Sequence, residues 1–186
     1  MIDIEKDLSI IFEKLKSEKG IYVIISNSNN YNQINKNLLI ELLKKQKLHC
    51  LYVSLNKRRN IIKIDLQNLD IDISNIYFID GVSTYSSKID ETKDCMIIKN
   101  INSLTEISLT ITAAINNGYF DFIFFDSLNT LFLYHEIKSI EKFIHYLFNK
   151  FSAFGIIGII ISSANDETTK IMPLLVQISN KVINLE

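Results

Sequence analysis

The chain has 186 residues, of which 47% are hydrophobic and 22% are charged, with one proline and five glycines. This length favours a single domain, and the composition excludes collagen-like, disulfide-rich and disordered proteins. Lysine and arginine (20) nearly balance aspartate and glutamate (21), so the net charge of −1 does not favour nucleic acid as a partner.

The first 19 residues predict a helix that packs on the core. Their apolar side chains repeat at helical spacing, at Ile4, Leu8, Ile11, Phe12 and Leu15. Gly20 follows as a stop signal. Acidic residues stand where a signal peptide would have a basic start and an apolar run, and the apolar stretch at residues 151–165 is too short to cross a bilayer. The sequence therefore predicts a cytoplasmic protein without a membrane span.

Residues 20–186 are expected to form one α/β domain. Strands are predicted at residues 21–26, 48–55, 76–80, 95–100, 120–126, 156–162 and 181–185, and most of these are apolar runs typical of strands buried on both faces. Helix signals lie between these runs, at residues 38–47, 60–69, 103–117, 136–154 and 169–179. This alternation predicts a mainly parallel, twisted sheet with helices on both faces, in three αβα layers. Residues 21–26, 122–126 and 156–162 are expected to be buried neighbours, and the polar residues 81–94 predict a long loop.

The carboxyl ends of the strands are where such a sheet binds ligands. Polar residues follow five of the strands, at residues 26–33, 55–59, 80–83, 126–130 and 162–167. A phosphate-binding loop after the first strand would read G-x-x-x-x-G-K-[ST]. Aligned without gaps, Asn27 and Asn32 fall where the glycines belong, Gln33 where the lysine belongs, and Ile34 where the magnesium-binding hydroxyl belongs. The sequence therefore predicts a degenerate loop that has lost its phosphate cradle.

Charged side chains mark two further strand ends. Asp126 ends an apolar strand, either like the acid that holds magnesium through water in P-loop ATPases or as the cap of a helix that begins at Ser127. Ser127 lacks the glycine-framed elbow of a hydrolase nucleophile. The basic triplet Lys57, Arg58 and Arg59 is either a phosphate clamp or arginine finger, or a solvated loop, and we favour the loop.

Neither a metal site nor a catalytic residue is predicted. The three histidines, His49, His135 and His145, share no metal-binding spacing. Cys50 and Cys95 stand alone, without a C-x-x-C pattern, and are expected to be small buried thiols. The composition and these spacings thus leave the strand ends as the candidate site.

Several segments resemble, in order and spacing, the KaiC-like branch of the RecA-type ATPases: IYVIIS, LYVSLNK, IYFIDGVS, NSLTEISLTI, FDFIFFDSLNTLFLYH and GIIGIIISS…NKVINL. The similarity covers residues 20–186 and is closest to small archaeal KaiC-like proteins of unassigned function, with residues 126–134 the most specific part. It implies a RecA-like core with Asp126 as the Walker B acid. Active KaiC-type domains carry catalytic glutamates just after the second strand, where this chain has Leu55, Asn56 and Lys57, so the base is missing.

Three functions can be weighed from these residues. The first is a non-catalytic KaiC-like module without a cofactor, acting through contacts with copies of itself or with a related ATPase subunit. The second is a slow or unconventional ATPase that uses ATP and magnesium, with Lys36 or a partner's arginine replacing the missing charges. The third, a receiver-type signalling domain, needs paired acids after the first strand and a lysine after the last; Asn27 and Glu186 argue against it.

Overall fold

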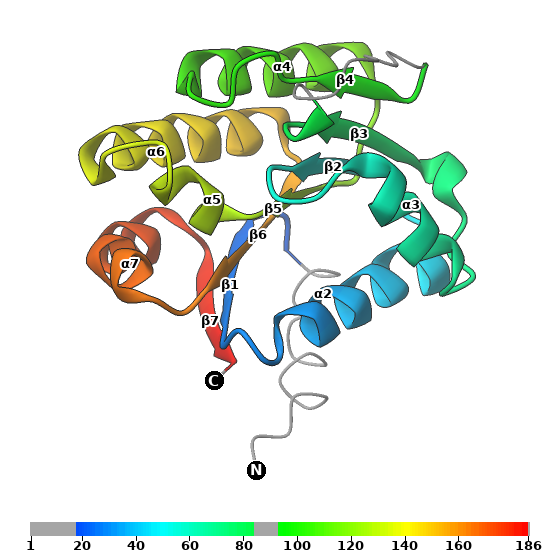
Figure 1. The fold of residues 1–186 in the computed structure, drawn as a ribbon, viewed down its shortest axis with the longest axis horizontal. Coiled ribbons are helices and arrows are strands. Elements are labelled where there is room, and N and C mark those ends of the chain that lie inside the picture. Colours follow the sequence, from blue (N-terminus) through cyan, green and yellow to red (C-terminus); the bar gives the residue numbers. More distant parts are fainter. Residues whose placement is uncertain (1–17, 84–92, 186) are drawn as a thin grey trace.

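Figure 1 shows the computed structural model of the chain, which describes residues 18–83 and 93–185. The helix predicted for the first 19 residues and most of the loop predicted at residues 81–94 lie outside the described residues. In the described part of the chain, no helix is both long and apolar enough to cross a membrane.

The described strands form one seven-stranded sheet in the order β4-β3-β2-β5-β6-β1-β7. Every neighbouring pair is parallel, which confirms the predicted fold class. The strands are β1 (Ile21–Ser26), β2 (Cys50–Ser54), β3 (Ile76–Asp80), β4 (Cys95–Ile97), β5 (Phe122–Asp126), β6 (Ile157–Ser163) and β7 (Lys181–Leu185). β6 lies between β1 and β5, so the three strands expected to be buried neighbours are neighbours.

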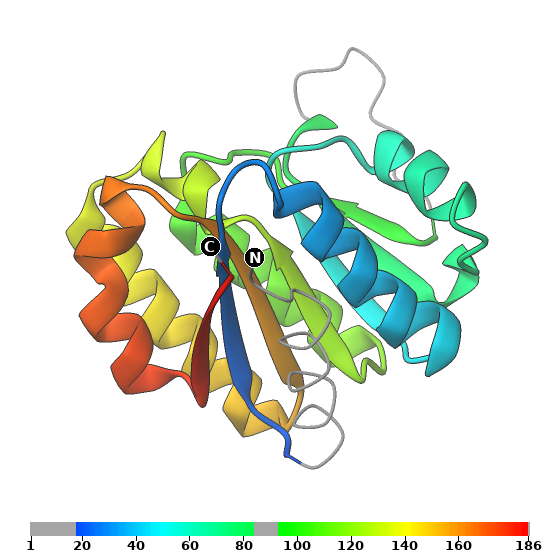
Figure 2. The same ribbon diagram turned by 90° about the horizontal axis from the view of Figure 1, so that it is seen from below.

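Helices cover both faces of the sheet, as Figures 1 and 2 show. One face packs against α4 (Leu104–Asn117), α5 (Leu128–Phe132), α6 (Ile137–Phe154) and α7 (Asp166–Ile178). The other packs against α2 (Tyr31–Leu39), its continuation as the π-helix η1 (Ile40–Lys45), and α3 (Arg59–Gln67); the 3-10 turn η2 (Ile73–Asn75) precedes β3. The three predicted layers are therefore present.

The central strands are almost entirely apolar because each of their faces meets a helical layer. In β1, Val23 and Ile25 belong to the core beneath α4, α6 and α7, whereas Tyr22 and Ile24 belong to the core beneath α2 and α3. Alternate residues of a strand point to opposite faces of the sheet, so a strand that is covered on both sides must be apolar at every position.

Local side-chain caps set the start of two helices. At the start of α4, Ser103 Oγ accepts a hydrogen bond from the amide of Glu106 at 3.2 Å. α7 begins three residues earlier than the predicted 169, because Asn165 Oδ1 accepts from the amide of Thr168 at 2.7 Å. Asp166 and Glu167 then occupy the first turn, where negative charge favours a helix.

Candidate functional site

Asp126 is the centre of a buried polar cluster at the carboxyl ends of the strands. Its side chain accepts hydrogen bonds from three neutral donors, although the residue is only 2% exposed. Tyr52 Oη donates to Oδ2 at 2.8 Å, and Asn56 Nδ2 donates to Oδ1 at 2.9 Å. The hydroxyl of Tyr31 also donates to Oδ1. Both carboxylate oxygens of Asp126 are therefore engaged by the protein itself.

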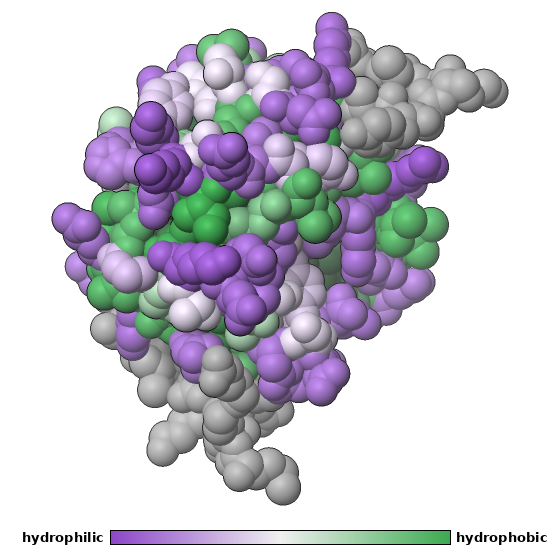
Figure 3. Space-filling model, turned by 60° about the vertical axis from the view of Figure 1, so that its left-hand side comes forward, coloured by the Kyte–Doolittle hydropathy of each residue, from purple (hydrophilic) through white to green (hydrophobic). Residues whose placement is uncertain are grey.

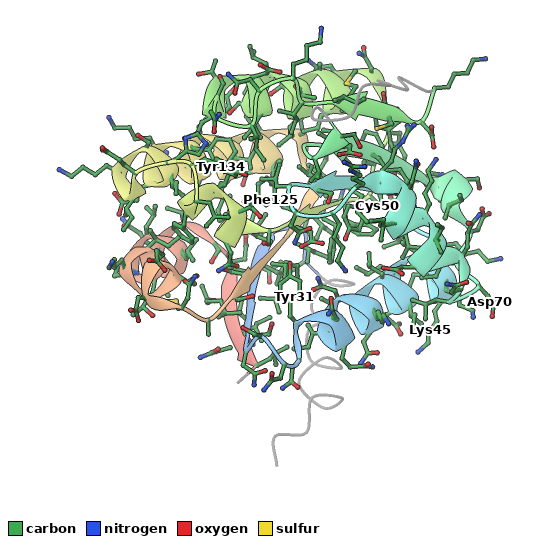
Figure 4. All side chains as sticks on the ribbon, in the orientation of Figure 1. Tyr31, Lys45, Cys50, Asp70, Phe125 and Tyr134 are labelled. Atoms are coloured by element: carbon green, nitrogen blue, oxygen red, sulfur yellow. The ribbon has the colours of Figure 1, made fainter. Side chains whose placement is uncertain are left out.

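Three elements bring these donors together. The pairing of β2 with β5 places Ser54 opposite Asp126, so Tyr52 lies two residues back on the same face, within the diagonal reach of an aromatic side chain. Asn56 follows the end of β2. Tyr31 is the first residue of α2 and lies between that helix and the strand ends (Figure 4). The cluster thus ties α2 to the middle of the sheet.

The two phenols of this cluster remain protonated at physiological pH. Burial raises the pKa of Tyr31 above its ordinary value, and the negative charge of Asp126 raises it further. Burial, followed by the charge of Asp126, also raises the pKa of Tyr52. Both hydroxyls are therefore lasting hydrogen-bond donors, which is what a buried carboxylate needs when no cation is its partner.

The segment after β1 is a tight turn that leads straight into α2. The carbonyl oxygen of Asn27 accepts hydrogen bonds from the amides of Asn30 at 3.2 Å and Tyr31 at 3.1 Å. Asn27 Oδ1 also accepts from the amide of Asn30, at 2.9 Å. In a phosphate-binding loop, successive amides point at the ligand. Here these two amides bond to Asn27 instead.

The other residues expected in the degenerate loop point in different directions. Ile34 is fully buried in the core between α2 and the sheet. Gln33 Nε2 donates to Asn37 Oδ1 at 3.0 Å along the outside of α2. Asn32 is exposed, and its Oδ1 accepts a long hydrogen bond of 3.5 Å from Lys57 Nζ. The structure therefore places neither an ammonium group nor a hydroxyl at the positions of the expected lysine and serine or threonine.

The three residues of the basic triplet face different neighbours. Lys57 faces α2, and Arg58 is the exposed N-cap of α3. Arg59 is only 7% exposed, and its amide donates to Asp80 Oδ2 at 2.9 Å while its Nη1 lies 3.8 Å from Asp94 Oδ1. Arg59 therefore belongs to the packing of α3 against β3 and β4, and the three cations do not converge on one ligand.

The helix α5, which follows Asp126, connects the end of β5 to the end of β6. Ser127 is the N-cap of α5, so the alternative in which Asp126 caps a helix beginning at Ser127 is not what the structure shows. Asn129 of α5 holds the end of β6: its Oδ1 accepts from the amide of Ser163 at 2.5 Å and from Ser162 Oγ at 3.2 Å. This contact fixes the spacing between the ends of β5 and β6.

Tyr31 and Tyr52 are members of the site that the sequence does not predict. Tyr52 lies inside an apolar strand pattern, where an aromatic residue predicts core packing. The one available signal was that a buried tyrosine hydroxyl usually has a hydrogen-bond partner, and the partner becomes evident only when the register of β2 against β5 is known. Tyr31 stands among asparagines and carries no motif of its own.

A small hollow lies beside Asp126, under α2 and α3. Its volume is about 40 Å³, and Asn35, Tyr52, Lys57 and Asp126 are among its lining residues. Within residues 18–83 and 93–185, the buried Asn35 Oδ1 has no hydrogen-bond partner. Small-molecule pockets usually measure about 300–1,000 Å³, whereas this hollow has room for water.

A Tyr31→Phe variant tests whether the cluster stabilises the protein. Removing this hydroxyl takes one donor from a buried carboxylate, so we expect the free energy of unfolding to fall by about 1–3 kcal/mol. Urea unfolding followed by circular dichroism measures this change. Tyr134→Phe is the matched control, because it makes the same chemical change at a well-exposed tyrosine. Equal stabilities of the two variants would contradict a structural role of the cluster.

The chain is similar to known proteins both in its sequence and in its fold. The family described as "ATPase: KaiC" matches residues 32–186. Among solved structures, a KaiC-like protein from the hyperthermophilic archaeon Pyrococcus horikoshii OT3 superposes with a TM-score of 0.61 at 12% sequence identity, over 89% of this chain and 70% of that chain. At that identity the likeness concerns the fold alone. The search of curated proteins returned no match.

Proposed function

The chain belongs to the KaiC family of ATPase domains. We propose that it is a non-catalytic member of this family that works as a regulatory or assembly module through protein contacts. One observation carries this proposal. Asp126, in the position of the magnesium-binding acid, has both carboxylate oxygens occupied by Tyr31, Tyr52 and Asn56. These hydrogen bonds fill three of the roughly four acceptor positions of a carboxylate, so magnesium, or a water bound to it, would find at most about one position left on Asp126.

The surroundings of Asp126 support the same conclusion. Phosphoryl transfer depends on loop amides and a lysine around the phosphates, a hydroxyl on the metal and a group that positions the attacking water. Gln33 and Ile34 stand where the lysine and the hydroxyl would be, and Asn56 stands where the catalytic acid would be. The family fold is thus kept while the groups that would bind and activate ATP are replaced.

The exposed residues of the same edge suit a protein partner better than an anion. Asn29, Asn32, Gln33 and Asn56 are all exposed. Their amide side chains both donate and accept hydrogen bonds, so they match the mixed polar groups of a protein surface. A related ATPase subunit, or a second copy of this chain, is the partner that we propose for this edge.

An ATP titration by calorimetry, with magnesium present, tests the proposal. We expect no binding heat up to millimolar ATP for the wild type, and the same result for Asp126→Asn. The control for loss of an acid is Asp70→Asn, whose side chain is 89% exposed. Micromolar binding by the wild type and by Asp70→Asn that is lost in Asp126→Asn would contradict the non-catalytic proposal.

A weak ATP-binding protein, completed by a partner subunit, is the second candidate. The observation in its favour is an ammonium group near the start of α2, because Lys57 Nζ lies 3.5 Å from Asn32 Oδ1. Lys36 and Lys57 also line the hollow beside Asp126. This candidate requires measurable ATP binding that weakens in Lys57→Ala, so the same titration separates it from the first.

A further inference from the structure

One end of the sheet face that carries α2 and α3 has no helix over it among residues 18–83 and 93–185. α2 leads from β1 to β2, and α3 leads from β2 to β3. Figure 2 looks onto this face: α2 (blue) and α3 (cyan) lie over one half of it, whereas β1 and β7 are seen without a described helix in front of them. We call the side of β1 and β7 that faces the viewer there, on the same side of the sheet as α2, the β1–β7 face.

The β1–β7 face is mostly apolar. β1 and β7 pair in parallel with Ile24 opposite Ile183, and alternate residues of a strand share one side of the sheet. The apolar side chains on this side are Tyr22, Ile24, Ile183 and Leu185. The polar residues in the same register, Lys181 and Ser26, lie at the two ends. In parallel sheets such a face is normally covered by a helix.

The chain enters the β1–β7 face at Glu18. Tyr22 Oη donates a hydrogen bond to the carbonyl oxygen of Glu18 at 2.9 Å, and the Tyr22 side chain belongs to the core on the α2 side of the sheet. Glu18 therefore lies on that side, beside the start of β1. Residues 1–17 precede this point directly, so the path of the chain delivers them to the face that has no described helix.

We propose that residues 1–17 cover the β1–β7 face as an amphipathic helix. The apolar stripe that the sequence predicts for this helix consists of Ile4, Leu8, Ile11 and Leu15. A helix through residues 4–15 is about 18 Å long at about 1.5 Å per residue. β1 has six residues and extends over about 20 Å. The stripe and the strand therefore match in length.

The connection to β1 favours this occupant over a second copy of the chain. A segment joined to its binding surface by a short linker competes at an effective concentration in the millimolar range. Only Glu18, Lys19 and Gly20 separate residues 1–17 from β1, so the same segment of another molecule would be outcompeted at micromolar protein concentration. The proposal is independent of the proposed function, because the cover acts on the packing of β1 and β7 whether or not ATP binds near Asp126.

Thiol labelling of an Ile183→Cys variant of the full chain tests the proposal. Cys50 and Cys95 are both buried, so a maleimide reports on the new thiol of β7. We expect Ile11→Asp in this background to raise the labelling rate at least about tenfold, because burial of one isoleucine shifts a local opening equilibrium by at least that factor. Ser9→Asp, which adds the same charge on the opposite side of the predicted helix, should leave the rate unchanged.

Val176→Cys supplies the reference rate of an accessible thiol. Val176 belongs to α7 and is 61% exposed; Figure 3 brings the side of α6 and α7 forward and shows apolar residues between hydrophilic ones. Without Ile11→Asp, the thiol of Ile183→Cys should react more slowly than this reference. Mass spectrometry of the labelled protein should also find Cys50 unlabelled in every variant, because Cys50 lies in the middle of the covered sheet.

Three results would overturn the proposal. An Ile183→Cys rate that Ile11→Asp does not change would mean that residues 1–17 do not cover the β1–β7 face. A rate that falls as the protein concentration rises would assign the cover to a second copy of the chain. Labelling of Cys50 as fast as that of the new thiol would mean that Ile11→Asp unfolds the whole domain, so that residues 1–17 are not a local cover of β1 and β7.

Discussion

An Ile159→Asp variant is expected to lose most of the wild type's free energy of unfolding. Ile159 is fully buried in β6, where it lies between Tyr22 of β1 and Phe124 of β5. An aspartate there loses the packing of a core isoleucine, a cost of about 2–5 kcal/mol, and adds a buried unpaired charge that costs several kcal/mol more. Domains of this kind are stable by roughly 5–15 kcal/mol, so the two costs together consume most of that margin.

Thermal unfolding followed by circular dichroism measures this effect. Ile64→Asp is the matched control, because it makes the same change at a side chain of α3 that is 57% exposed. We expect the control to change the free energy of unfolding by no more than about 0.5 kcal/mol. A midpoint for Ile159→Asp equal to that of the control would mean that β6 is not in the middle of a covered sheet.

The fold could be predicted from the sequence because a strand that is covered on both faces is recognisable as a continuous run of apolar residues. The continuous apolar runs located all seven strands, and residues 76–80 and 181–185 agree with β3 and β7 at both ends. The boundaries of helices are harder to predict from the sequence than those of strands. The segment predicted as one helix to residue 47 ends as the π-helix Ile40–Lys45. The sequence could not predict this ending, because hydrophobic spacing does not distinguish an i→i+4 from an i→i+5 hydrogen-bond pattern.

Only part of the candidate site could be predicted, and the reason is geometric. Asp126 could be singled out because it ends an apolar strand, and Ile34 because an apolar side chain replaces an expected hydroxyl. That Asp126 contacts Tyr31 and Tyr52 depends on the register of β2 against β5 and on how α2 leans over the strand ends. These are relations between segments far apart in the chain, and no local pattern encodes them.

Phosphate release from ATP by the isolated protein is expected to be no faster than that of an Asp126→Asn variant. Transition-state charge in phosphoryl transfer is stabilised by loop amides, a lysine and magnesium, and a positioned group activates the water. When the sequence is aligned with the pattern of an active ATPase, Gln33 stands in place of the lysine, Ile34 in place of a hydroxyl that binds the magnesium, and Asn56 in place of the expected acid. The amides of Asn30 and Tyr31 bond to Asn27.

The size of the expected loss follows from transition-state arithmetic. If each replacement costs about 3 kcal/mol and the effects are only partly additive, a total of about 6 kcal/mol slows turnover by more than 10⁴-fold, since each 1.4 kcal/mol is about a tenfold change in rate. A coupled assay of phosphate release on both proteins measures this, with Tyr134→Phe as a control preparation. Turnover well above background in the wild type and Tyr134→Phe, abolished in Asp126→Asn, would mean that Asp126 does hold the metal. Tyr31 and Tyr52 would then have to release its carboxylate during each cycle, and the proposed non-catalytic function would be wrong.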